Sequence, residues 1–406
     1  MTIPEGWKIT SYKDIADINS DSIKVDKFEH DTIQYIDIAS IQTTGKIEKP
    51  AEIKLDEAPS RAKRIVHDGD ILVSTVRPYL RSFAYVEEAS DNLIASTGYA
   101  VLSPKSKVDG KFIYQTILTS RFIDNLNARL RGSNYPAVSS KDVGEMLLLL
   151  PSLPEQKKIA EILGSVDEAI QATQETIEQT KRVKKGLLQD LLTKGIGHTR
   201  FKKTEIGEIP EEWEVMKLED LSNIRRGASP RPIRDPKWFA DEGRGWVRIE
   251  DVTGQGKYLR TTKQRLSKLG VEKSVPINPG DLIMSICATI GVPSMVEMQA
   301  CIHDGFVLFQ DISDRLLRPY LYYSILNRRN SFTSKGQPGT QKNINTSIVK
   351  NVRIPMPSLS EQRQITNVLD SIDDLIGIEE SSFGALEELK KGLMQDLLTG
   401  DVRVTT

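Results

Sequence analysis

The residues of this sequence that could perform catalysis are few and scattered along the chain. His303 is followed by Asp304, and a histidine beside a carboxylate can act as a general base. The other histidines, at positions 30, 67 and 198, do not cluster with this pair by sequence, so we interpret His303 as a structural hydrogen-bonding residue.

The two cysteines, Cys287 and Cys301, belong to neither a CxxC nor a CxxH motif. This spacing favours a buried pair of reduced thiols over a metal site or a disulfide.

Side chains that can contact nucleic acid are more numerous, and they cluster in segments whose composition predicts loops. Arginine pairs with guanine, and asparagine or glutamine pairs with adenine, while serine, threonine and tyrosine reach phosphates or base edges. For any single arginine the alternative is a solvated charge or a phosphate contact, whereas clusters on loops favour base recognition. The predicted DNA-contacting set is Arg77, Tyr79, Arg81, Arg131, Ser133, Asn134, Tyr135, Arg225, Arg226, Ser229, Arg231, Arg234, Arg244, Arg248, Thr289, Gln337, Thr340, Gln341 and Asn343.

A tandem repeat organises the chain that carries these residues. IPEGW at Ile3–Trp7 recurs as IPEEW at Ile209–Trp213, an offset of 206. The same offset of 206 relates PSLPEQKKI to PSLSEQRQI, and KKGLLQDLLT to KKGLMQDLLT. One offset in three separated blocks indicates a duplicated unit, each copy a globular part followed by a helix.

Inside the globular parts the offset changes, and the loops diverge. GDILVS at Gly69–Ser74 matches GDLIMS at Gly280–Ser285 with an offset of 211, and the offset returns to 206 where Ala137 matches Asn343. The stretch Arg77–Arg81 is thereby aligned with Ala288–Gly291. This pattern predicts a shared scaffold whose loops have been replaced, and loops are where recognition residues are usually found.

Each globular part is followed by a pattern of helical period. Apolar positions from Ile159 to Leu191 and from Ile365 to Leu397 follow alternating steps of four and three, which predicts a heptad seam in each helix. A helix of about 40 residues would span roughly 60 Å, more than one small domain can cover, so we expect the two seams to pair rather than to pack separately. An antiparallel pair would place Lys184 near Asp373 and Asp374, and Lys390 near Asp167 and Glu168. Pro154 and Ser360 are the predicted starts.

The globular parts mix short strands with one helix each. In the first, strands are predicted at 34–41, 71–76, 83–86 and 99–102, and a helix at 111–130; in the second, strands at 246–252, 282–286 and 306–309, and a helix at 319–329. The predicted fold class is α+β: two globular domains separated by two long antiparallel coiled-coil helices, related by a pseudo-twofold axis. The predicted boundaries are 1–150 for the first domain, 151–194 for the first helix, 195–355 for a linker and the second domain, 356–400 for the second helix and 401–406 for a tail.

The charge distribution is compatible with a DNA-facing globular part. The net charge is −1; Pro154–Lys194 holds seven acidic and seven basic residues, and Ser360–Thr399 holds nine acidic and three basic. The second helix therefore has a net charge of −6 and the first a net charge of zero, which leaves a net charge of +5 for the rest of the chain. No stretch has the roughly 20 apolar residues of a membrane span, and MTIPEGWKIT at 1–10 lacks the apolar segment typical of a signal peptide. The cysteine usage favours a reducing cytoplasm.

The P-S-L-x-E-Q-x-x-I segment that opens each long helix, and the E-x-W start of each globular part, resemble type I restriction–modification specificity subunits. This resemblance covers essentially the whole chain. It implies that each globular part is a target recognition domain for double-stranded DNA. It also implies that the helices act as a spacer and dock two methylation subunits, which bind S-adenosylmethionine and methylate adenine, while a separate restriction subunit cuts DNA.

The sequence itself contains no motif for that chemistry. An N/D-P-P-aromatic motif, a glycine-rich cofactor loop and a Walker A sequence are all missing, and Gly195-Ile196-Gly197 follows a helix and fits a helix C-cap and linker instead. We therefore expect a non-catalytic subunit without a cofactor or metal of its own. Two alternatives are a duplicated coiled-coil adaptor that does not bind DNA, against which the arginine-rich loops argue, and a self-sufficient DNA enzyme, against which the missing motifs argue.

Overall fold

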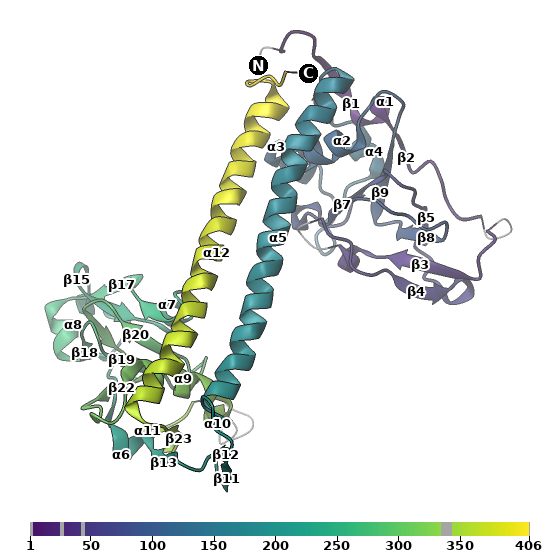
Figure 1. Ribbon diagram of the computed structural model, residues 1–406. Helices are drawn as coiled ribbons and strands as arrows, with labels where there is room; N and C mark the ends of the chain where they lie inside the picture. Colours follow the sequence, from purple (N-terminus) through teal and green to yellow (C-terminus); the bar gives the residue numbers. More distant parts are fainter. Residues whose placement is uncertain (1–2, 25–27, 42–44, 334–342, 406) are drawn as a thin grey trace. The chain divides into compact units, whose positions relative to one another are not determined.

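The computed structural model describes residues 3–24, 28–41, 45–333 and 343–405 of the chain. It divides into two compact units: unit 1 consists of Met1–Thr176 with Glu379–Thr406, and unit 2 consists of Ile177–Ile378. The division falls inside both long helices, so each unit contains a part of each helix and one globular domain (Figure 1). We use "first domain" for the elements that precede the first long helix and "second domain" for those between the two long helices.

The first domain is built from three small sheets and short helices. Its main sheet has the strand order β2-β9-β6-β7, its second sheet the order β4-β3-β8-β5, and β1 pairs with β10. The elements are β1 (Lys8–Ser11), α1 (Tyr12–Ile15), β2 (Ala16–Ile18), β3 (Thr32–Ile36), η2 (Ile38–Ser40), β4 (Ala51–Lys54), η3 (Leu55–Glu57), β5 (Ala62–Ile65), β6 (Ile71–Ser74), η4 (Pro78–Leu80), β7 (Phe83–Tyr85), β8 (Leu93–Ser96), β9 (Tyr99–Pro104), α2 (Gly110–Ile117), α3 (Ser120–Asn127), α4 (Ser140–Gly144) and β10 (Leu147–Leu150).

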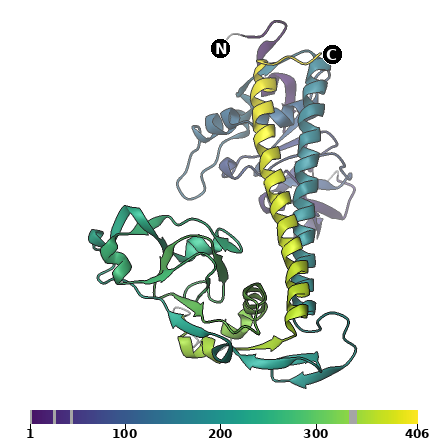
Figure 2. The same ribbon diagram turned by 60° about the vertical axis from the view of Figure 1, so that its left-hand side comes forward.

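The second domain repeats this topology with additions. Its sheets have the orders β14-β22-β19-β20-β16 and β17-β15-β21-β18, and β13 pairs with β23. The hairpin β11–β12 precedes them and is seen at the bottom of Figure 2. The elements are β11 (Phe201–Thr204), β12 (Gly207–Pro210), β13 (Glu214–Lys217), α6 (Leu218–Leu221), β14 (Asn223–Arg226), η5 (Pro236–Trp238), β15 (Phe239–Val247), α7 (Ile249–Thr253), β16 (Tyr258–Leu259), β17 (Gln264–Leu266), α8 (Lys268–Glu272), β18 (Val275–Ile277), β19 (Leu282–Ser285), β20 (Pro293–Val296), β21 (Ala300–Ile302), β22 (Phe306–Gln310), α9 (Arg318–Asn327), α10 (Arg329–Thr333), α11 (Thr346–Lys350) and β23 (Arg353–Met356).

The two domains therefore share a scaffold, as the repeat predicted, and the α+β class is confirmed. Both second sheets contain one parallel pair, β3 with β8 and β15 with β21, flanked by antiparallel neighbours. The equivalent pair Ile71↔Leu102 in the first domain is Leu282↔Phe309 in the second. The first residue of each pair keeps the offset of 211.

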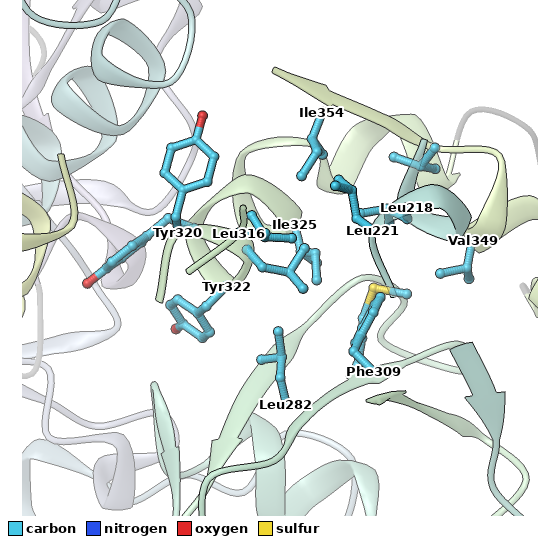
Figure 3. Packing of buried hydrophobic residues seen from close by; sticks show 14 of the residues in the cluster. Leu218, Leu221, Leu282, Phe309, Leu316, Tyr320, Tyr322, Ile325, Val349 and Ile354 are labelled. Atoms are coloured by element: carbon cyan, nitrogen blue, oxygen red, sulfur yellow. The ribbon is translucent and has the colours of Figure 1, made fainter. Parts of the chain in front are cut away.

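The main sheet of each domain is buried on both faces. Along β19, Leu282 and Met284 point into one apolar cluster and Ile283 into another, because successive strand residues face opposite sides of a sheet. Figure 3 shows Leu282 and Phe309 directed toward side chains of the surrounding helices, among them Ile325. Burial on both faces explains why these strands are continuous apolar runs instead of alternating patterns.

Several predicted elements end earlier than expected, and two of the strands do so by five residues. The strands predicted at 34–41 and 246–252 stop at Ile36 and Val247, and a helical turn follows each of them. In the first domain, the carboxylate of Asp37 accepts hydrogen bonds from the backbone N–H groups of Ala39 and Ser40, at 2.9 and 3.1 Å, and this cap favours the turn over an extended chain.

The prediction of one continuous helix at 111–130 was wrong. The structure has two helices there, α2 and α3, with Thr119 between them. The hydroxyl of Thr119 accepts a hydrogen bond from the backbone N–H of Phe122, 3.2 Å away, and so starts a new helix. Both helices bury apolar residues in the core of the first domain, Phe112 from α2 and Leu126 from α3 among them.

The long helices are α5 (Leu153–Leu191) and α12 (Leu359–Thr399). In unit 1, Ile159 and Leu163 near the start of α5 share a core with Leu397 and Leu398 near the end of α12. In unit 2 the partners are reversed: the end of α5 and the start of α12 share a core. The helices are therefore antiparallel in each unit, as predicted.

The predicted seam positions of both helices are all buried or half-buried. They are Ile159, Leu163, Val166, Ile170, Thr173, Ile177, Thr180, Lys184, Leu187 and Leu191 in α5, and Ile365, Leu369, Ile372, Ile376, Glu379, Phe383, Leu386, Lys390, Leu393 and Leu397 in α12.

The predicted register is confirmed in both units. Lys184 forms an ion pair with Asp373 in unit 2, and Lys390 forms one with Asp167 in unit 1, at 2.5 Å. Asp374 and Glu168, the other expected partners, are exposed.

The predicted helix starts need correction, because α5 and α12 begin one residue earlier than Pro154 and Ser360. At α12 the cap is Ser358, whose hydroxyl accepts from the backbone N–H of Glu361 at 3.3 Å.

The helix starts are fastened to their domains by the glutamine of the P-S-L-x-E-Q motif. The side-chain amide of Gln156 donates to the carbonyl of Pro151, and its oxygen accepts from the backbone N–H of Asp109, both at 2.9 Å. Gln362 makes the equivalent bonds to Pro357 and to the backbone N–H of Leu317, at 3.0 and 2.9 Å. Among the described residues, no helix has the length and apolar character needed to span a bilayer.

Candidate nucleic-acid interface

The first predicted reading loop of the first domain follows β6 and has an unusual backbone. Arg77 and Arg81 both adopt left-handed conformations, with φ of +47° and +56°, and η4 lies between them. The loop is held by the backbone N–H of Arg77, which donates to the carbonyl of Pro136 at 2.9 Å. Tyr79 and Arg81 are exposed, whereas Arg77 is half-buried. The backbone of the loop is thus held in place, with Tyr79 and Arg81 at the surface.

The second predicted loop of this domain, 131–135, comes directly alongside. Arg131 and Ala137 exchange two backbone hydrogen bonds of 2.9 Å, which close the loop, and Gly132 supplies the left-handed residue that the turn needs, with φ of +89°. The guanidinium of Arg77 donates to the carbonyl oxygen of Asn134 at 3.3 Å and lies 5.2 Å from the centre of the Tyr135 ring. The structure therefore brings three of the predicted residues together.

The remaining predicted residues of these loops are at the surface. Tyr135 is 74% exposed, the largest value among the exposed bulky apolar and aromatic residues of the described chain, and Ser133 is also exposed. Arg131 lies 3.4 Å from the carboxylate of Asp142, which is itself held by Ser139. The hydrogen bonds from the side chain and the backbone of Ser139 lower the pKa of Asp142, so this carboxylate stays charged beside Arg131.

In the second domain, Asp304 organises several of the predicted residues. Its carboxylate accepts a hydrogen bond from Ser229 at 2.6 Å and pairs with Arg231 at 2.8 Å, while its backbone carbonyl accepts from Arg226 at 2.9 Å. Burial raises the pKa of Asp304, but the bond from Ser229 and the charge of Arg231 together hold it below its ordinary value. Asp304 thus holds two arginines, Arg231 through its charged carboxylate and Arg226 through its backbone carbonyl.

His303 makes a hydrogen bond of the structural kind expected from the sequence. Its Nδ1 accepts a hydrogen bond from the backbone N–H of Gly305 at 2.8 Å, so a neutral ring carries its proton on Nε2. The ring packs against Trp246 and Phe306, with centroids 5.8 and 5.0 Å away. Burial, and then the charge of Arg248, lower the pKa of His303 and favour the neutral ring.

The other predicted residues of the second domain differ in their surroundings. Arg225, Arg234 and Arg248 are exposed, whereas Arg244 is half-buried and donates to the carbonyl of Ile277 at 2.9 Å and to Asn278 at 2.6 Å. Thr289 is half-buried in the loop after β19, and Asn343 is exposed. Gln337, Thr340 and Gln341 lie outside the described residues.

The loops of the two domains occupy equivalent places. Val76 bridges to Ala137 in the first domain, and Cys287 bridges to Asn343 in the second. The next hydrogen bond is also shared: the backbone N–H of Val138 donates to Thr75 at 2.9 Å, and that of Ile344 donates to Ile286 at 3.0 Å. The repeat alignment of the sequence is confirmed residue by residue at this point.

Two residues outside the predicted DNA-contacting set belong to this region. Asp304 stands in the second domain where the first domain has Thr97. Its role in holding arginines follows from three hydrogen bonds to residues that are distant in sequence. Cys287 is half-buried, not buried as expected, although both cysteines are free as expected. The sequence signal that pointed to Asp304 was a difference between the two copies: Ser96-Thr97 in the first copy aligns with His303-Asp304 in the second.

Comparison with known proteins agrees with this arrangement. The family model described as the type I restriction modification DNA specificity domain matches residues 4–182 and again residues 210–388. These two matches are offset by 206 residues, as in the repeat.

Relatives resemble the chain over most of its length. The type I restriction enzyme MjaVIII specificity subunit of Methanocaldococcus jannaschii is 32% identical over 77% of this chain and 75% of its own. The putative MjaX specificity subunit of the same organism is 28% identical over 100% of this chain and 95% of its own.

Solved structures agree with the fold. A chain from a structure described as the basis of complex assembly and conformational transition of the type I R-M system has a TM-score of 0.62 at 25% identity, covering 99% of this chain and 100% of that one. The S subunit from M. genitalium has a TM-score of 0.60 at 12% identity, covering 100% and 99% of the two chains, which shows the fold alone. The matches are to DNA specificity domains, and they do not support the adaptor alternative. With two DNA specificity domains joined to two antiparallel helices, the chain belongs to the type I restriction–modification specificity family.

Proposed function

We propose that this chain reads a bipartite, asymmetric DNA site, with one half-site recognised by each domain. The observation that carries the proposal is that the two domains share their strand order and loop frame but differ in the side chains on equivalent loops. Arg77, Asn134 and Tyr135 form one cluster in the first domain, whereas Arg226, Ser229 and Arg231 gather around Asp304 in the second. Two different surfaces on one scaffold suit two different base sequences.

The proposal includes the partners that supply the chemistry. Two methylation subunits, one per repeat, bind S-adenosylmethionine and flip out an adenine in each half-site, and a restriction subunit cuts DNA in the same cytoplasmic complex. The specificity chain itself is non-catalytic, takes no cofactor and does not enter a membrane. The isolated chain should therefore transfer no methyl group, and two methylation subunits per chain should restore methylation.

A domain exchange tests this proposal. Residues 1–150 are replaced by the corresponding part of a related specificity subunit, and methylated adenines are mapped across a genome that carries the complex. We expect one half-site to change and the other to remain. A matched exchange of residues 195–355 should change only the other half. Loss of both half-site sequences in either chimaera that still folds and assembles would contradict separate reading by the two domains.

A further inference from the structure

We propose that Arg77 in the first domain and its equivalent Ala288 in the second occupy a specificity-determining position, where the side chain decides whether guanine is selected at one base pair of the half-site. This inference rests on the proposed function, because it concerns how the same two domains read DNA.

The backbone at this position is the same in both domains. Arg77 has φ of +47° and Ala288 has φ of +54°, a left-handed conformation that residues with a Cβ atom rarely adopt. A second left-handed residue follows in each loop, Arg81 at +56° and Gly291 at +74°. Since arginine and alanine hold the same conformation, it is imposed by the surrounding chain and not by the side chain.

Equivalent contacts explain how the surroundings impose it. The position immediately before Arg77 bridges to Ala137, and the position immediately before Ala288 bridges to Asn343. One residue further back, Thr75 and Ile286 donate their backbone N–H groups to Gly98 and Gly305, both at 2.8 Å. A fixed frame with an interchangeable side chain is the property that a reading position requires.

In the first domain this frame presents an arginine in a restrained geometry. Its guanidinium donates to the carbonyl of Asn134 at 3.3 Å and lies over the exposed ring of Tyr135. That bond uses one of the five N–H groups of the planar guanidinium, and the contact with the Tyr135 ring further restrains its orientation. A restrained guanidinium edge matches the N7 and O6 acceptors of guanine in the major groove.

In the second domain the frame presents a methyl group, and a cavity of about 340 Å³ lies beside it. Its polar lining includes Arg226, His303, Asp304 and Asn343, and Ala288 and Cys287 are among the other residues of its wall. Arg226 is held at the carbonyl of Asp304, and Asn343 is exposed. The amide of Asn343 is of the kind that pairs with adenine, and no arginine stands at the position equivalent to Arg77.

The two domains supply matched variants for the experiment. Arg77→Ala gives the first loop a side chain that the second loop already carries on the same backbone, and Ala288→Arg does the reverse. Arg77→Lys retains the charge but loses the two-pronged edge. Each variant is assembled with its methylation subunits, and methylation rates are measured on DNA in which every half-site base pair is changed in turn. Thermal unfolding checks the fold, and Arg77→Gly provides a second deletion that relieves the left-handed backbone.

We expect Arg77→Ala to reduce the preference for guanine at one base pair of one half-site by about 10- to 100-fold, with the other half-site unchanged. Arg77→Lys should lose most of this preference, and Ala288→Arg should create a guanine preference in the other half-site. An equal loss on every sequence would identify Arg77 as a phosphate contact and overturn the inference. Unchanged preferences in folded Arg77→Ala or Arg77→Gly would overturn it as well. If the unaltered complex prefers no sequence, the proposed function itself fails, which is a distinguishable result.

Discussion

The indole nitrogen of Trp7 donates a 3.0 Å hydrogen bond to the carboxylate of Glu155, 148 residues later. Trp213 makes the same bond to Glu361, at 2.9 Å and the same separation. These residues are the tryptophan of the E-x-W motif and the glutamate of the P-S-L-x-E-Q motif, so the two sequence signatures of each repeat contact each other. The bond fastens the start of each long helix to the start of its domain.

The second partner of the glutamate differs between the units. In unit 1, Arg403 donates to Glu155 from two nitrogens, at 2.6 and 3.0 Å. In unit 2, Nε2 of His198 lies 2.8 Å from Glu361, and the backbone N–H of Ile196 donates to the same oxygen at 3.0 Å. In both cases the chain that follows one long helix returns to the beginning of the other.

The first prediction concerns this carboxylate. Glu155→Gln keeps the shape but removes the charge of a residue that is 4% exposed, so the free energy of unfolding should fall by about 1–3 kcal/mol. Chemical denaturation measures it. Glu161→Gln, on the same helix with a side chain 69% exposed, is the control and should change stability by less than about 0.5 kcal/mol. Equal small effects of both substitutions would mean that the Trp7–Glu155 contact does not stabilise the helix start.

The second prediction concerns helix register. Lys390 and Asp167 are partly buried, with side chains 18% and 32% exposed, so their coupling should exceed that of a surface pair. Lys390→Glu and Asp167→Lys should each lower stability, and the double reversal should recover about 1–2 kcal/mol in a double-mutant cycle. Lys158 and Glu161, 3.0 Å apart on the exposed face, form the control cycle, with an expected coupling of less than about 0.5 kcal/mol. No recovery in the Lys390–Asp167 double variant would exclude a role in register.

The third prediction concerns pH. Burial and Arg248 lower the pKa of His303 in the folded chain, so the unfolded chain binds a proton more readily there. The stability that His303 contributes is therefore present above about pH 6.5 and is lost as the pH falls through the folded-state pKa. Urea unfolding between pH 8 and 5 should show this loss.

His303→Asn retains an acceptor for the backbone of Gly305 without titrating, so it should flatten the profile in this range. Arg248→Gln removes the nearby positive charge and should make the loss of stability smaller than in the unaltered chain. An unchanged slope in His303→Asn would assign the pH dependence to other groups.

The fourth prediction concerns the length of the helix pair and depends on the proposed function. Counting inward from the Lys390–Asp167 ion pair, the junction after Glu175 in α5 falls opposite the junction after Ser381 in α12. Inserting seven residues at both junctions preserves the heptad seam and adds about 10 Å of helix. That length corresponds to about three base pairs at 3.4 Å per step.

Methylation mapping should then show a longer gap between the half-sites, or activity should be lost through rotational mismatch on the duplex. Insertion into α5 alone should disturb the seam and lower stability, which serves as the control. Full activity with the original gap in the double insertion would show that the helices do not set the spacing.

The sequence by itself determined the repeat, the helices and their pairing. A constant offset of 206 and a heptad period can be read directly from the order of the residues, and they identified the seam residues, the Lys184–Asp373 pair and the loops that carry Arg77 and Asn134.

The tertiary structure decided what no periodicity encodes: the strand order, the turns after Ile36 and Val247, and the division of the predicted helix at Thr119. It also decided that Arg77 and Ala288 share one left-handed backbone and that Asp304 anchors Ser229 and Arg231. Such features depend on hydrogen bonds between residues far apart in the chain, because a cap, a bridge or a buried carboxylate is stable only when its distant partner is already in place.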